Sequence, residues 1–222
     1  MKKIPSFLVV SRYNEDYSWI YDYVDGDNYL IYNKGEKINN DPHVLNVPNI
    51  GGNQRDIFEF CYSHYKKLPN TVAFTQAYPW DHCPLDFFKK LIYNEFFTPL
   101  EFYGFTPANG LEGRTENGNF LEGNVPWYIA SHNKTYGLTC RYSSLDEFMN
   151  KYFENYFHVD YIPFAPGSQL IIEKSQILQY PRKFWKQMRN ELDGFNMTEA
   201  HVIERSLTLI FTGGLKLRDE FE

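Results

Sequence analysis

Cysteine is scarce in this chain of 222 residues. The three cysteines, Cys61, Cys83 and Cys140, lie far apart, and no C-x-x-C pair occurs. Zinc ribbons and disulfide-stapled scaffolds need clustered cysteines, so neither is expected here. This cysteine usage fits a reducing compartment, and we therefore expect a cytoplasmic location.

A basic stripe and a long apolar run are also missing. Lysine and arginine together number 22 against 28 acidic residues, which gives a formal net charge of −6. Such a chain is poorly suited to binding a nucleic-acid backbone. The apolar run after the basic start "MKK" is too short for a signal peptide, and no stretch approaches the ~18 apolar residues of a membrane span. We expect neither a nucleic-acid partner nor a membrane span.

The glycine motifs of the common nucleotide-binding folds are absent as well. Neither GxxxxGK[ST] nor GxGxxG occurs, which excludes the P-loop and the dinucleotide fingerprint on pattern. Gly51 and Gly52 do stand immediately before a predicted helix, with Arg55 in its first turn. Exposed N–H groups there would suit an anion, although an ordinary turn before a capped helix has the same pattern.

Apolar and aromatic side chains are plentiful, and they fall into alternating strand and helix patterns. Hydrophobic residues make up 43 %, enough for a packed core. Strands are predicted over Phe7–Val10, Tyr29–Tyr32, Thr71–Thr75 and Ser168–Ile172, and helices over 53–68, 85–97, 144–157, 181–192 and 198–211. The alternation predicts an α/β fold with a central, mostly parallel mixed sheet flanked by helices. The Gly- and Asn-rich stretch 105–127 predicts a loop of the kind that often forms a lid.

Polar side chains follow the predicted strands. Asn33 and Lys34 come after the second strand, and a longer cluster comes after the first: Ser11, Arg12, Tyr13, Asn14, Glu15 and Asp16. In parallel α/β sheets, ligands bind beyond the carboxyl ends of the strands. These side chains are therefore expected to meet at one edge of the sheet, although each cluster alone could be an ordinary turn.

Asp81 is the sharpest single candidate. The third strand breaks at Pro79, and the break places Trp80, Asp81 and His82 together. A hard cation such as Mn²⁺ or Mg²⁺ is often held by one or two carboxylates plus diphosphate oxygens, which is a role that Asp81 could fill. His82 could ligate Mn²⁺ or bind a phosphate, or it could simply pack.

Seven segments, taken in order, resemble one family. "VVSRYNED", "IYNKG", "PNIGGNQRD", "LPNTVAFTQAYPWDH", "PFAPGSQLIIEKSQI", "YPRKFW" and "ERSLTLIF" are similar to glycosyltransferases of the GT-A fold, above all to those that large algal (chlorella-type) DNA viruses encode to decorate capsid glycans. The resemblance runs over nearly the whole chain. It implies one nucleotide-sugar-binding domain over residues 1–222, which could be part of a longer protein, acting as a monomer in the host cytoplasm.

The resemblance also implies roles for individual residues. Ser11, Arg12 and Tyr13 would contact the nucleotide, Asn33 would lie near the base or ribose, and Arg55 would face the base or the diphosphate.

The segment from Gln76 to Asp81 would occupy the place of the family's acidic DxD signature. It carries one carboxylate where the signature has two. Asp81 would then hold the cation, Mn²⁺ or Mg²⁺, together with diphosphate and water or a remote ligand. Trp80 and His82 would contact substrate.

The segment "APGSQ" is expected to contact the sugar. Gly167 would let the backbone approach a ligand closely, and Ser168 and Gln169 can hydrogen-bond sugar hydroxyls. A plain turn would have the same sequence.

The implied activity is metal-dependent transfer of a hexose from a UDP-sugar, such as UDP-glucose, to a glycan or glycoprotein acceptor. An inverting enzyme needs a carboxylate base, and Glu204 and then Glu199 on the last helix are the candidates. Alternatively, Glu199 could form a capping box with Asn196, and Glu204 an ion pair with Arg205. A metal-dependent phosphoesterase or a non-catalytic carbohydrate-binding module are the competing functions.

Overall fold

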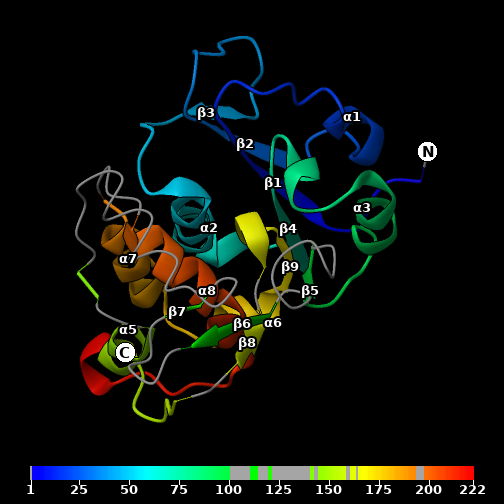
Figure 1. Cartoon of the computed structure of the whole chain (residues 1–222). Coiled ribbons are helices and arrows are strands. Elements are labelled where there is room, and N and C mark those ends of the chain that lie inside the picture. The colour runs from blue at the N-terminus through cyan, green and yellow to red at the C-terminus, as the bar shows by residue number, and fades with distance from the viewer. Residues whose placement is uncertain are drawn as a thin grey trace.

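The computed structural model describes residues 2–100, 111–114, 120–121, 141–142, 145–158, 161–163, 165–193 and 198–222. Its centre is a six-stranded mixed sheet flanked by helices (Figure 1), in the order β3-β2-β1-β4-β9-β5. The strands are β1 (Phe7–Arg12), β2 (Tyr29–Asn33), β3 (Val44–Asn46), β4 (Thr71–Gln76), β5 (Thr98–Pro99) and β9 (Leu170–Glu173). The first four are parallel, and β9 runs antiparallel to both β4 and β5. The predicted α/β class with a mostly parallel sheet is confirmed.

Each central strand buries both faces, because its apolar residues alternate between two cores. Val9 and Tyr32 pack into one cluster, whereas Val10 and Ile31, their chain neighbours, pack into the other. Strand side chains alternate with a period of two, so the same rule continues into the polar residues at the strand ends.

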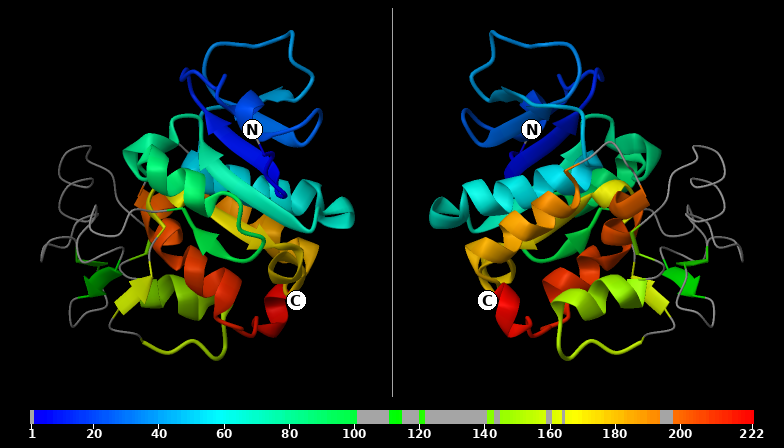
Figure 2. Two further views of the ribbon diagram at one scale, coloured as in Figure 1. Left: turned by 90° about the vertical axis from the view of Figure 1, so that its right-hand side faces the viewer. Right: turned by 90° about the vertical axis from the view of Figure 1, so that its left-hand side faces the viewer.

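Helices cover the two faces unequally. They are α1 (Ile20–Tyr23), α2 (Gly52–Ser63), α3 (Leu85–Leu91), α5 (Leu145–Tyr152), α6 (Lys174–Leu178), α7 (Arg182–Glu191) and α8 (Thr198–Thr212). One face carries α2, α7 and α8, with α2 and α7 side by side, and the other carries α1 and α3 (Figures 1 and 2). Among the described helices, none is long and apolar enough to cross a membrane.

Several predicted boundaries differ from the structure. The helices expected over 53–68, 85–97 and 144–157 end at Ser63, Leu91 and Tyr152. The strand expected from Ser168 begins at Leu170, because Pro166–Ser168 form a 3-10 turn in which Gly167 has φ +66°. The stretch predicted as a loop over 105–127 contains two short strands, β6 (Leu111–Arg114) and β7 (Phe120–Leu121), which form a second sheet with β8 (Tyr161–Pro163). Strands this short are too brief to show a period-two pattern.

The order of the sheet creates a reversal beside β1. The chain runs from β1 to β2 and β3 on one side, and then crosses through α2 to β4 on the other side of β1. The crevice at the carboxyl ends of two such strands is where open α/β sheets bind ligands.

Candidate functional site

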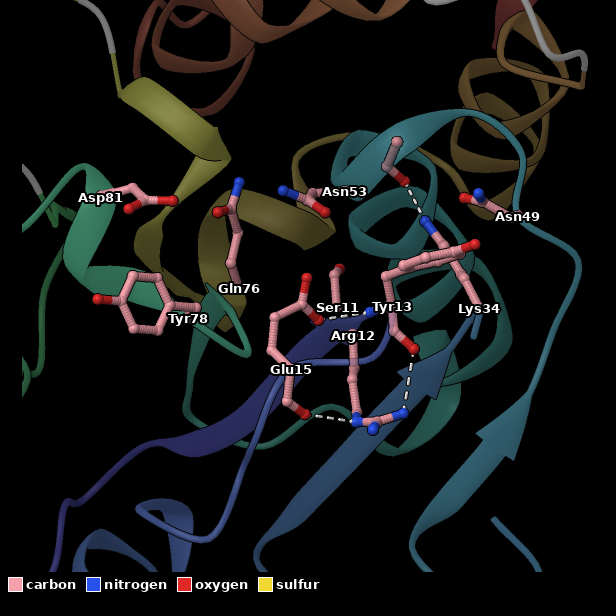
Figure 3. Close-up of a pocket in the computed structure, with 11 residues that line it drawn as sticks. Ser11, Arg12, Tyr13, Glu15, Lys34, Asn49, Asn53, Gln76, Tyr78 and Asp81 are labelled. Carbon is pink, nitrogen blue, oxygen red and sulfur yellow. Dashed lines mark hydrogen bonds between the residues drawn. The ribbon is translucent and has the colours of Figure 1, made fainter. Parts of the chain in front are cut away.

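A cavity of about 390 Å³ lies at this reversal, between the carboxyl ends of β1, β2 and β4 and the start of α2. Its size is within the range of small-molecule sites. The cavity is shown in Figure 3, and its lining residues are Ser11, Arg12, Tyr13, Glu15, Lys34, Asn49, Gly52, Asn53, Gln76, Tyr78 and Asp81.

A buried cluster of three residues, Ser11, Lys34 and Asp56, forms the α2 side of the cavity. Ser11 and Lys34 follow the alternation of β1 and β2 toward α2, where both meet Asp56. The Ser11 hydroxyl donates to Asp56 Oδ2 at 2.7 Å, and Lys34 Nζ lies 2.8 Å from the same oxygen. Burial raises the pKa of the Asp56 carboxyl, and the Lys34 ammonium and the Ser11 hydroxyl oppose that effect.

The neighbouring residues of the same strands face away from α2 and form a separate network. Arg12 donates to Asn33 Oδ1 at 2.6 Å, and the Asn33 amide donates to Asn46 Oδ1 and to the Glu36 carbonyl, each at 2.7 Å. Asn33 is 1 % exposed. It therefore joins the ends of β1, β2 and β3 and does not line the cavity, where it was expected to meet a base or ribose.

Arg12 borders the cavity, but its guanidinium holds the loop after β1. It donates to the carbonyls of Tyr13 and Glu15, at 3.1 and 2.8 Å (Figure 3). Gly35 packs against this loop so closely that a Cβ there would lie 1.6 Å from the Tyr13 carbonyl oxygen. The Arg12 side chain at the end of β1 and the backbone at Gly35 after β2 thus set the positions of Tyr13 and Glu15.

The end of β4 carries Asp81 to the opposite side of the cavity. The strand stops at Gln76, and Pro79–Asp81 form a 3-10 turn that leaves Asp81 exposed. Gln169 is fully buried and fixes this turn. Its side-chain oxygen accepts from the backbone N–H of Gln76 at 3.2 Å, and its side-chain NH₂ donates to the Pro79 carbonyl at 3.0 Å. Gln169 therefore fixes the turn that carries Asp81 and does not itself line the cavity.

The turn at Gly167 and Ser168 connects the start of α2 to the end of β4. Asn53 donates to the Gly167 carbonyl at 3.2 Å, and Gln54 donates to the Ser168 hydroxyl at 2.7 Å. A Cβ on Gly167 would lie 2.5 Å from the His82 ring and 2.9 Å from Gln76 Nε2. Both turn residues have left-handed backbones, with φ +66° and +56°. The contacts from α2 hold Ser168 in a conformation that non-glycine residues seldom adopt.

Five of the predicted residues line the cavity together: Ser11, Arg12, Tyr13, Gln76 and Asp81. The others lie elsewhere. Four of them lie around the end of β4 and do not line the cavity: Gly167, Ser168, Gln169 and His82. Trp80 packs in edge contact with Trp19 and Phe88 on the face that α1 and α3 cover. Arg55 points to the end of α7, where it binds Asp193 Oδ1 at 3.0 and 3.1 Å.

Several lining residues were given no binding role from the sequence, although Glu15 and Lys34 were among the polar residues noted at the strand ends. Glu15, Lys34, Asn49, Asn53 and Tyr78 all border the cavity. Tyr13 and Tyr78 are about half exposed, at 52 % and 49 %, and their rings stand on different sides of it (Figure 3). The strand alternation could have identified Lys34, because Tyr32 on the same side packs against α2.

The two candidate bases lie on α8 and are buried, and neither lines the cavity. Glu199 accepts from the Arg141 amide at 2.9 Å and from Arg141 Nε at 3.2 Å. Glu204 lies 3.3 Å from Arg205 Nη1, so the predicted ion pair is present. Asn196, the partner of the alternative capping box, lies outside the described residues.

The acidic residues of the cavity would make an incomplete cage for a cation. Asp81 and Glu15 are the carboxylates that line it. In the part of the chain that the structure describes, no three His, Cys, Asp or Glu side chains come together in a group that could hold a metal ion. A cation at Asp81 would therefore take most of its oxygen ligands from a bound molecule and from water.

Comparison of the chain with protein-family models, with curated proteins and with solved structures gives no match.

Proposed function

We propose that the protein is a nucleotide-sugar-dependent glycosyltransferase with a GT-A-like fold. It would transfer a hexose from a UDP-sugar, such as UDP-glucose, to a glycan or glycoprotein acceptor. The observation that carries this proposal is the cavity at the reversal between β1 and β4, lined by polar strand-end residues with Asp81 at its edge. The resemblance of seven ordered sequence segments to algal-virus glycosyltransferases supports it and suggests capsid glycans as the acceptor.

The chemistry needs stabilisation of a departing diphosphate. A divalent cation, Mn²⁺ or Mg²⁺, supplies positive charge to that leaving group when bound. Asp81 would hold it, with Glu15 as the other carboxylate of the cavity. One or two carboxylates plus substrate phosphates are the usual protein contribution to such a site, so this sparse donor set fits.

The chain's own residues would orient the two substrates. Tyr13 and Tyr78 offer aromatic faces and hydroxyl groups on different sides of the cavity, which suits a base and a sugar ring. Gln76 offers an amide between them (Figure 3). The resemblance suggests Glu204, with Glu199 as the alternative, as the acceptor-side base, although neither side chain lines this cavity, so either would act only at an acceptor bound beyond it.

Nucleotide binding is the direct test. We expect UDP with Mn²⁺, at about a hundredfold excess over its dissociation constant, to stabilise the fold by ~2.7 kcal/mol and so raise the melting temperature by roughly 5–10 °C. Asp81→Ala should abolish the part of this shift that depends on Mn²⁺. Asp86→Asn removes an exposed carboxylate five positions along the chain, in the first turn of α3, and is the matched control.

Two results would count against the proposal. One is a wild-type melting curve that millimolar UDP and Mn²⁺ leave unchanged. The other is an equal loss of the Mn²⁺ effect in Asp86→Asn and Asp81→Ala, because Asp81 would then have no special part in it. Release of UDP from UDP-glucose only in the presence of a glycan acceptor would establish transfer over hydrolysis.

A further inference from the structure

Lys34 occupies an unusual position for a lysine. Its side chain is only 6 % exposed, yet it lines the cavity at the end of β2. Its ammonium pairs with Asp56 and also donates to the Gly52 carbonyl at the start of α2. An ammonium has three donors, so one remains for a group inside the cavity.

A contribution to folding stability does not by itself account for the buried ion pair of Lys34 and Asp56. Asp56 is completely buried, and its Oδ1 has no hydrogen-bond partner among the residues that the structure describes. Desolvating two charges costs several kcal/mol per ion, and a well-packed apolar pair is often at least as stable. The buried pair does, however, hold an ammonium with a fixed direction beside an open cavity.

The start of α2 adds a second source of positive potential at the same place. Gly52 and Asn53 line the cavity next to Lys34, and α2 is a helix of 12 residues. The first N–H groups of a helix have no partner within the helix, and its dipole favours negative charge there. The two lining carboxylates, Glu15 and Asp81, come from other elements, and Asp81 lies across the cavity from Lys34 (Figure 3).

We propose that Lys34, with the first turn of α2, binds a phosphate group of the nucleotide donor directly and without a cation. Asp56 and Ser11 act as positioning residues, because they hold the ammonium through contacts at 2.8 and 2.7 Å to a shared carboxylate oxygen. This inference rests on the proposed function for the identity of the donor. It gives the phosphates two separate anchors, Lys34 at one end of the cavity and the cation at Asp81.

The test compares Asp56→Asn with the double variant Lys34→Met/Asp56→Asn by calorimetric titration. Both lack the buried carboxylate, so the double variant leaves no uncompensated charge and the comparison isolates the ammonium. The probes are uridine, UMP and UDP, each measured in EDTA. Lys37→Met, an exposed lysine three positions further on, controls for the change in net charge.

We expect the double variant to bind UDP roughly tenfold to a hundredfold more weakly than Asp56→Asn does, the effect of losing a hydrogen bond between charged groups. Uridine affinity should be the same in both, because uridine has no phosphate. Lys37→Met should bind UDP as wild type does. If the double variant does not fold in urea-titration controls, Lys34→Gln/Asp56→Asn, which keeps a donor for the Gly52 carbonyl, carries the same comparison.

Equal UDP affinity of the double variant, Asp56→Asn and wild type in EDTA would overturn the inference and leave the proposed function standing. Equal weakening of UDP binding in both variants, with uridine affinity unchanged, would show that Lys34 binds phosphate only when Asp56 positions it. If wild type binds no uridine nucleotide with or without Mn²⁺, the proposed function fails, and inorganic pyrophosphate becomes the probe. Pyrophosphate binding that depends on Lys34 would then support the phosphate site by itself. Absence of pyrophosphate binding to wild type would overturn it.

Discussion

Replacing Gly167 by alanine should disrupt the contact that joins the end of β4 to the turn before β9. The position has φ +66°, where an L-residue is less stable than glycine by about 1–2 kcal/mol. The new Cβ would also lie 2.5 Å from His82 Cδ2, against the ~3.5–4.0 Å of a normal carbon–carbon contact. The ring would have to move by about 1 Å, and overpacking of this kind costs about 1–3 kcal/mol.

The expected total loss for Gly167→Ala is therefore about 2–5 kcal/mol, a large part of a typical stability of about 5–15 kcal/mol. Gly26→Ala is the matched control. Gly26 has φ +49°, but a Cβ there meets nothing within 4 Å, so only the backbone strain applies. Urea denaturation of the two variants should show Gly167→Ala to be the less stable by about 1–3 kcal/mol.

A third variant separates packing from strain. In Gly167→Ala/His82→Ala, the ring that the new methyl group meets is gone, so the combined loss should be smaller than the sum of the single losses. Equal losses for Gly167→Ala and Gly26→Ala, or strict additivity with His82→Ala, would show that the turn does not press on His82. The close packing of Gly167 against His82 and Gln76 would then be refuted.

Two further predictions concern buried polar groups. Burial acts to raise the pKa of Glu191, but hydrogen bonds from Lys151, Tyr142 and Tyr152 bring it below the ordinary value of 4.5. This stabilisation is complete above that value and is lost as the pH falls through the lower, folded-state pKa. Glu191→Gln should therefore unfold more easily at pH 7 and lose less stability than wild type between about pH 5 and 3, measured by urea midpoints. Asn33→Ala removes three hydrogen bonds from the strand-end network and should cost about 2–3 kcal/mol by the same assay, whereas a loss under 1 kcal/mol would show that Arg12 and the ends of β2 and β3 do not depend on it.

The fold class was predictable because its signals are local. The segments Phe7–Arg12 and Thr71–Gln76 have apolar centres, end in polar residues and are buried on both faces, and both form central strands. Strands β3 and β5, with three and two residues, carry no such signal. Their places in the sheet come from pairing with β2 and β9, which is a tertiary effect.

The candidate site was predictable in position and less so in detail. Polar residues after β1, β2 and β4 do meet at one edge of the sheet. Both Asn33 and Lys34 were named at the end of the second strand, and a binding role was given to Asn33 alone. In the structure, alternation turns Lys34 toward α2 and the cavity and turns Asn33 away. Counting from Tyr32, which packs against α2, would have separated the two.

The contacts that fix the site join residues far apart in the chain. Gln54 binds Ser168 across 114 positions, and Gln76 meets Gln169 across 93. No spacing rule connects such residues, so the sequence can suggest that each is polar and near a turn but not that they are partners. Gln169 was expected to bind sugar, and in the structure its side-chain amide is buried and bridges two backbone groups, the Gln76 N–H and the Pro79 carbonyl.

The distribution of charge in the cavity favours a ligand with two unlike ends. The Lys34 and α2 end offers an ammonium donor and helix N–H groups, which suit an anion, whereas Asp81 and Glu15 suit a cation or hydroxyl donors. A neutral glycan would offer no anion to the remaining Lys34 donor and the helix N–H groups, and a bare phosphate would leave the carboxylates facing like charge. A nucleotide sugar would meet both ends, with a phosphate at Lys34 and a cation or sugar hydroxyls at the carboxylates. On these grounds we favour the proposed donor binding over a carbohydrate-binding module.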